Sequence, residues 1–297
     1  MKNKIIMHIN YVESGYNSFG KRSIDDICRF AADTGYDGIE FRGVIPKELS
    51  SLSFREYAEQ IAAGKKKYGL SEILFGIGAG DAANPDAEAR ARNVAEVLEK
   101  AKIAREVCGS EVCNTYSTWI KSPVPTVPQY GYEFHGSVAA SESQWKRIVD
   151  TYQQIGVGLE RIGLRFAFET HMSYVHDLPQ KSRELVDEIG SPMIGINMDY
   201  GNTFLFPVRP SVAECIDLYG DKLFYAHLKN YVSVPDAARE VATSLSGGEI
   251  NHRAYLEKLK EVGFSGPIAI EAPRPGDRLY FAREDLTYLK SVIADLA

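Results

Sequence analysis

The chain has 297 residues, of which 44% are hydrophobic and 25% are charged, a composition typical of a globular protein with a sizeable apolar core. Its formal net charge of −6 argues against a nucleic-acid partner, because a polyanion attracts basic surfaces. The apolar run after the N-terminal lysines is too short for a secretory signal or a membrane span, so we expect a cytoplasmic protein with no membrane partner.

Short apolar runs alternate with amphipathic stretches along the whole chain. Serine N-caps and glycines just past the last turn mark several helices, as in the stretch from Ser23 to Gly35. We predict strands at residues 4–9, 36–41, 73–76, 111–114, 164–169, 194–199, 223–227 and 267–271. We predict helices at residues 24–32, 54–68, 85–107, 143–159, 182–189, 211–219, 252–262 and 283–296.

This alternation of strand and helix continues through eight units without a linker rich in proline, glycine or serine. Strict alternation is typical of a parallel sheet, and eight uninterrupted units favour closure of that sheet into a barrel. We therefore predict an α/β protein with the (β/α)8 TIM-barrel architecture, and one domain that covers residues 1–297.

The last four predicted strands each end in an acidic residue or a histidine: Glu169, Asp199, His227 and Glu271. Residues at the carboxyl ends of barrel strands converge on one pocket. Burying three carboxylates together is costly unless a cation compensates their charge. The pattern therefore predicts a site for a divalent metal ion.

Two connections are longer than chain closure requires. Residues 115–142 follow the fourth predicted strand and contain three prolines among several aromatic residues, and residues 229–249 follow the seventh. Both lie on the face where the four strand-end residues should meet. We interpret them as a lid over a small substrate, with an ordinary surface loop as the alternative.

Four segments give the chain a resemblance to the xylose-isomerase-like barrel superfamily, in particular its sugar-phosphate isomerase/epimerase branch. These segments are residues 166–171, 197–202, 226–230 and 247–271. In that family a Glu, an Asp, a His and a second Glu bind one divalent ion, often Mn²⁺. Carried over by position, these ligands are Glu169, Asp199, His227 and Glu271. Oxygen ligands with one imidazole suit Mn²⁺, Mg²⁺ or Co²⁺, and Zn²⁺ remains an alternative.

The resemblance implies a metal-dependent sugar isomerase or epimerase. Such an enzyme removes a proton from the carbon next to a metal-bound carbonyl of a ketose or related polyhydroxy compound. By family position, Glu169 and Glu271 act as the catalytic base and acid in addition to binding the metal. Asp199 and His227 are ligands only.

Four further residues are candidates for substrate contacts. His171 follows Glu169 at the spacing of one strand face, and Lys229 follows His227 in the same way. Arg274 lies just after the last strand, where barrels often bind anionic groups. Asn202 stands where relatives often have a histidine, so it can bind a hydroxyl but cannot shuttle a proton. The alternatives are that His171 is an ordinary loop histidine and that Lys229 is a solvated lysine without a role in binding.

Other functions remain open. The closest is a dehydratase of the inosose or dehydroshikimate type, which would use the same site. An endonuclease for abasic DNA sites and a sugar-binding protein without activity are weaker alternatives. The sequence does not identify the sugar, its phosphorylation, the native metal or the oligomeric state, although family barrels often associate into homo-oligomers.

Overall fold

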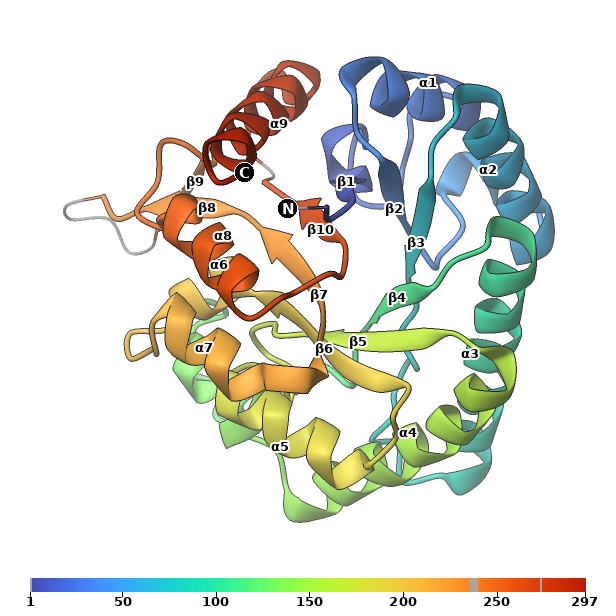
Figure 1. Cartoon of the computed structure of the whole chain (residues 1–297). Helices are drawn as coiled ribbons and strands as arrows, with labels where there is room; N and C mark the ends of the chain where they lie inside the picture. The colour runs from blue at the N-terminus through green and yellow to red at the C-terminus, as the bar shows by residue number, and fades with distance from the viewer. Residues whose placement is uncertain (1, 235–239, 273) are drawn as a thin grey trace. The chain divides into compact units, whose positions relative to one another are not determined.

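The computed structural model describes residues 2–234, 240–272 and 274–297 (Figure 1). Its main sheet is a closed barrel with the strand order β1-β10-β7-β6-β5-β4-β3-β2. The barrel strands are β1 (Ile5–His8), β2 (Gly38–Arg42), β3 (Glu72–Gly76), β4 (Val112–Thr115), β5 (Arg165–Glu169), β6 (Ile194–Asp199), β7 (Leu223–Leu228) and β10 (Ile268–Ile270). The predicted parallel (β/α)8 barrel is confirmed, while one domain over residues 1–297 stays a prediction.

Helices follow the barrel strands as the sequence predicts. They are α1 (Ile24–Thr34), α2 (Phe54–Tyr68), α3 (Ala87–Ile103), α4 (Glu142–Ile162), α5 (Pro179–Ile189), α6 (Tyr200–Phe204), α7 (Val212–Tyr219), α8 (His252–Glu261) and α9 (Arg278–Asp295). Four of these helices begin with a capping box, in which a serine hydroxyl and the acidic or amide side chain three residues later satisfy each other's backbone N–H groups.

The differences from the predicted boundaries have local causes. Helix α5 begins earlier than predicted because Pro179 occupies its first turn, where a missing N–H costs nothing. Helix α9 also begins earlier, since Asp277 caps it by accepting a hydrogen bond from the Tyr280 N–H. The short helix α6 was not predicted, and Asp199 caps it.

The chain forms two compact units, and the first comprises Met1–Gly76, Lys102–Glu111 and Ala226–Ala297. In unit one, α1 and α2 lie side by side outside β1, β2 and β3 (Figure 1). The parallel register of β1 and β2 pairs His8 with Glu40, and that of β10 and β7 pairs Ala269 with His227. This register brings polar strand-end residues of unit one to the same level of the sheet.

Unit two comprises Ile77–Ala101 and Val112–Tyr225. Its strands β4, β5 and β6 pair in parallel, with Phe168 beside Thr115 and Glu169 beside Asn197. Helix α5 packs against both α4 and α7 (Figure 1). Apolar side chains such as Phe166, Phe168 and Ile196 are fully buried beneath these helices.

Two strands lie outside the barrel. Strands β8 (Asn230–Val232) and β9 (Val241–Thr243) pair in antiparallel fashion after β7, within the second long connection predicted as a lid. Residues 235–239 of that connection lie outside the described residues. Among the described helices, none has the length and apolar character that a membrane crossing requires.

Candidate metal centre

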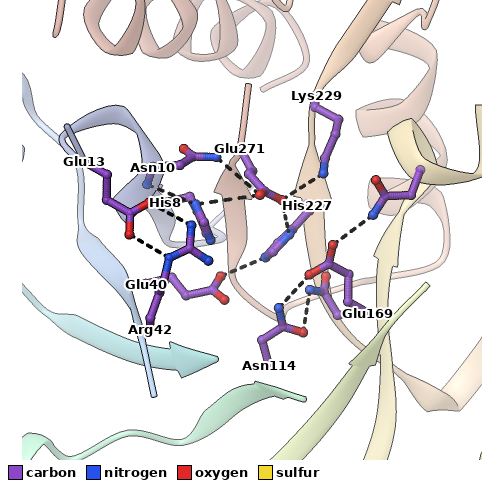
Figure 2. A network of polar contacts seen from close by, with 12 residues as sticks. His8, Asn10, Glu13, Glu40, Arg42, Asn114, Glu169, His227, Lys229 and Glu271 are labelled. Carbon is purple, nitrogen blue, oxygen red and sulfur yellow. Dashed lines mark hydrogen bonds and ion pairs between the residues drawn. The ribbon is translucent and has the colours of Figure 1, made fainter. Parts of the chain in front are cut away.

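In unit one, the carboxylate of Glu271 lies among several nitrogen atoms just after β10 (Figure 2). Lys229 Nζ is 2.9 Å from Oε2, and His227 Nδ1 is 3.1 Å from the same oxygen. On the other side, Asn10 Nδ2 donates to Oε1 over 3.3 Å, and His8 Nδ1 lies 3.8 Å from it. Burial alone would raise the pKa of Glu271, but Lys229, His8 and His227 hold it well below its ordinary value. Glu271 is therefore an anion beside the ammonium group of Lys229.

A second carboxylate orients His227. Glu40 lies on β2, opposite His8, the last residue of β1. Its Oε2 is 2.8 Å from His227 Nε2, and both side chains are buried. With the ring proton on Nε2, His227 donates to Glu40, and Nδ1 is the ring nitrogen that faces the Glu271 carboxylate. A carboxylate that orients the ring in this way is common around metal-binding histidines.

In unit two, neutral groups hold the carboxylate of Glu169 at the end of β5 (Figure 2). Asn114 Nδ2 and Tyr116 Oη each donate to Oε2 over 2.7 Å, and Asn202 Nδ2 donates to Oε1 over 2.9 Å. These hydrogen bonds fix the orientation of the carboxylate. The sequence reasoning missed Asn114 and Tyr116, although Asn114 is a polar residue at a strand end like the four that it did select.

Asp199 ends β6 and positions Asn202 one turn later. Its Oδ1 accepts a hydrogen bond of 3.0 Å from the Asn202 backbone N–H, which anchors the first turn of α6. The Asn202 side chain donates to Thr170 O over 3.2 Å as well as to Glu169. The structure thus uses Asn202 to hold a neighbouring carboxylate, and its predicted contact with a substrate hydroxyl stays a prediction.

The four predicted ligands come together. One potential ligand atom from each of Glu169, Asp199, His227 and Glu271 lies within 4.8 Å of the others. Three of these residues are buried and Glu271 is partly exposed. Three carboxylates and one imidazole fit a hard divalent cation such as Mn²⁺ or Mg²⁺ by donor type. That they bind a metal stays a prediction.

The remaining candidates for substrate contacts lie in different surroundings. Lys229 is 6% exposed and bonded to Glu271, so a freely solvated lysine does not describe it. His171 is partly exposed, and its Nδ1 lies 2.9 Å from Met172 O. Arg274 is 8% exposed, and its guanidinium bonds Asp285 over 2.6 Å and Glu284 over 2.7 Å. The contacts of Arg274 are those of a structural ion pair with α9, and its binding of substrate stays a prediction.

The buried side chain of His176 connects two segments of unit two. Its Nδ1 donates to the Glu169 backbone carbonyl over 2.6 Å, and its Nε2 accepts from the Ser117 N–H over 3.1 Å. Burial lowers the pKa of His176 to about 3, so the ring is neutral at physiological pH. The ring therefore ties the loop after β4 to the end of β5.

Comparison with known proteins identifies the family. A family model described as xylose isomerase-like TIM barrel matches residues 28–292. The chain belongs to this family. The resemblance inferred from the four sequence segments is therefore confirmed. No curated protein matches the chain in sequence.

Solved structures with the same fold cover almost the entire chain. D-allulose 3-epimerase from Methylomonas sp. superposes with a TM-score of 0.74 at 17% identity, covering 98% of this chain and 98% of that one. A probable 3-DHS dehydratase involved in petrobactin synthesis, from Bacillus anthracis, gives 0.73 at 17% identity, covering 97% and 98%. A xylose isomerase-like protein from Mycobacterium smegmatis in complex with magnesium gives 0.73 at 17% identity, covering 99% and 97%. At these identities the likeness establishes the fold.

Proposed function

We propose that this protein is a metal-dependent isomerase or epimerase of a small sugar. The observation that carries the proposal is the grouping of Glu169 and Glu271, two carboxylates held by different sets of donors, with Asp199 and His227 as the other potential metal ligands. The fold it shares with D-allulose 3-epimerase supports this reaction class. A protein that only binds sugar has no need for two opposed carboxylates.

The chain's own groups carry the proton. One carboxylate removes the proton from the carbon next to the substrate carbonyl, and the electrons of that C–H bond move into an enediolate. The second carboxylate, in its protonated form, returns a proton to the same carbon from the opposite side, which gives the epimer. Return of the proton to the neighbouring carbon gives the isomer instead. A divalent ion, when bound, supplies charge stabilisation for the developing enediolate.

The donors around each carboxylate suit these roles. The three neutral donors to Glu169 hold it in one orientation without neutralising its charge. Lys229 beside Glu271 places a positive charge next to the reacting region, which favours an anionic intermediate. We propose Mn²⁺ as the native ion, with Mg²⁺, Co²⁺ and Zn²⁺ as alternatives. The shared fold with a magnesium-bound protein supports a divalent ion.

A dehydratase is the second candidate. Lys229 Nζ, an acid within 2.9 Å of Glu271, could donate a proton to a leaving hydroxyl group after enolisation. The fold shared with the probable 3-DHS dehydratase supports this alternative. A dehydratase releases water and forms a conjugated enone, whereas an epimerase returns the proton to carbon.

The deciding experiment measures metal content and proton exchange together. The purified protein is analysed for metal by mass spectrometry and is then incubated with a panel of ketoses in D₂O, with and without chelator. One ion per chain and chelator-sensitive incorporation of deuterium next to the carbonyl would support the proposal. Enone absorbance without exchange would favour the dehydratase. Turnover that survives complete removal of metal would overturn both.

A further inference from the structure

A large aromatic side chain is held in place at the surface of unit two. The side chain of Trp119 is 56% exposed, although its surroundings are ordered by several contacts. Its backbone pairs with that of Tyr174, and the next residue, Ile120, donates to Ser173 O over 2.8 Å. The indole stacks on the Tyr174 ring at a centroid distance of 6.3 Å and an interplanar angle of 28°. Tryptophan is enriched at binding interfaces, because its side chain combines a large apolar ring with an N–H donor.

Aromatic contacts connect Trp119 with the proposed catalytic carboxylate, all within unit two. The Tyr174 ring lies 5.6 Å from the Tyr116 ring, and the Tyr116 hydroxyl donates to Glu169 Oε2 over 2.7 Å. His171 packs edge-on against both tyrosine rings. Two ring-to-ring steps thus lead from the exposed indole to the hydroxyl that orients Glu169.

Trp119 also lines a cavity of about 230 Å³. The walls combine apolar side chains with hydrogen-bonding groups, namely Val124, Val127, Lys121, Ser122, Gln129 and Ser173. A sugar ring has the matching chemistry, because its C–H faces pack on an aromatic ring while its hydroxyl groups exchange hydrogen bonds at the edge. At about 230 Å³ the cavity is smaller than the pockets that take drug-sized ligands, so we match it to a single ring.

We propose that this cavity is a subsite for a second ring of the substrate, which makes the substrate a glycoside or disaccharide rather than a free monosaccharide. The inference rests on the proposed function in one respect, namely that the other ring of the substrate reacts at Glu169. A phosphate group fits the cavity less well. Lys121 is the single lysine or arginine among its described lining residues, and its Nζ lies over the indole at 5.6 Å from the ring centroid.

A binding experiment that needs neither metal nor turnover tests the subsite. The protein has two tryptophans, so the Trp145→Phe variant leaves the Trp119 indole as the sole tryptophan reporter. We expect cellobiose to change its fluorescence in a saturable manner, with an affinity at least tenfold higher than that of glucose. An equal response to both sugars, or no saturable response to cellobiose, would overturn the proposal.

Variants separate a real subsite from a general surface effect. Trp119→Ala should weaken cellobiose binding at least tenfold by calorimetry, and Trp119→Phe, which keeps a ring on Tyr174, should lose less. Tyr130→Ala is the matched control, because Tyr130 is 54% exposed on the same connection but does not line the cavity. An equal loss in both alanine variants would contradict the proposal. So would Trp119 fluorescence that depends on protein concentration without sugar, since it would indicate self-association through this surface.

The two proposals fail separately. Cellobiose binding at Trp119 without deuterium exchange in any ketose would leave the subsite standing and remove the proposed function. Exchange in a free ketose, with no response of Trp119 to cellobiose, would leave the function standing and remove the subsite.

Discussion

Glu271 in unit one and Glu169 in unit two are the same side chain in two different settings. Glu271 lies beside Lys229 and two histidines. Its ionisation therefore depends on the charge of neighbouring side chains. Glu169 accepts hydrogen bonds from two amides and a phenol, all of them neutral at physiological pH. The two glutamates thus differ in what their neighbours supply. A neighbouring charge acts on the carboxylate of Glu271, whereas neutral hydrogen bonds fix the orientation of the Glu169 carboxylate.

The largest expected effect comes from removing either carboxylate. Glu271→Gln and Glu169→Gln should each lower kcat by about 10³-fold, because general acid–base groups contribute on the order of 10² to 10⁴. Proton exchange and net epimerisation, measured separately for each variant, should show which carboxylate removes the proton. A variant with near-normal kcat would remove that residue from the acid–base role.

His227, the proposed metal ligand that Glu40 orients, provides the next test. His227→Ala should abolish stoichiometric metal binding. Glu40→Ala should weaken metal affinity by about 10–100-fold, the usual cost of losing a carboxylate that orients a ligating histidine. Glu40→Gln can still accept the hydrogen bond from Nε2 and is the matched control. Calorimetric titration with Mn²⁺ measures all three, and equal affinity of the Ala and Gln variants would contradict the orienting role.

Charge and orientation can be separated with Lys229 and Tyr116. Lys229→Met should lower kcat/KM by about 10–100-fold, since a hydrogen bond to a charged group contributes about 1.5–3 kcal/mol. Tyr116→Phe should cost roughly fivefold, because Asn114 still donates to the same Glu169 oxygen. Steady-state kinetics at several salt concentrations should show a salt-dependent loss for Lys229→Met alone. If both variants behave alike, the contrast between the two settings is wrong.

The last test concerns a buried histidine of unit one, and it is measured as stability and not as activity. Burial lowers the pKa of His252 to about 4, so the folded state keeps the ring neutral while the unfolded chain takes up a proton below about pH 6.5. The free energy of unfolding should therefore fall by up to about 3 kcal/mol as the pH drops from 7 to 4. His252→Phe should flatten this part of the profile in urea unfolding experiments. An unchanged slope would assign the acid sensitivity to other groups.

Local sequence pattern was sufficient for the barrel and for the four potential ligands. Alternating apolar runs and amphipathic helices identify the (β/α)8 architecture. The hydrophobic period of each strand or helix is visible in its own residues, without knowledge of its partners. Glu169, Asp199, His227 and Glu271 could be found for the same reason, since each ends an apolar run abruptly. Their convergence then follows from the parallel direction of the strands.

Only the tertiary structure decided which groups support those residues. Glu40 and His227 are 187 residues apart, and the hydrogen bond between them depends on how distant strands are brought together. Tyr116 reaches Glu169 from the loop after β4, and Arg274, predicted to bind substrate, bonds Asp285 on α9. Such partners leave no periodic signal, because a hydrogen bond depends on the distance between two side chains in space and not on the pattern around either one.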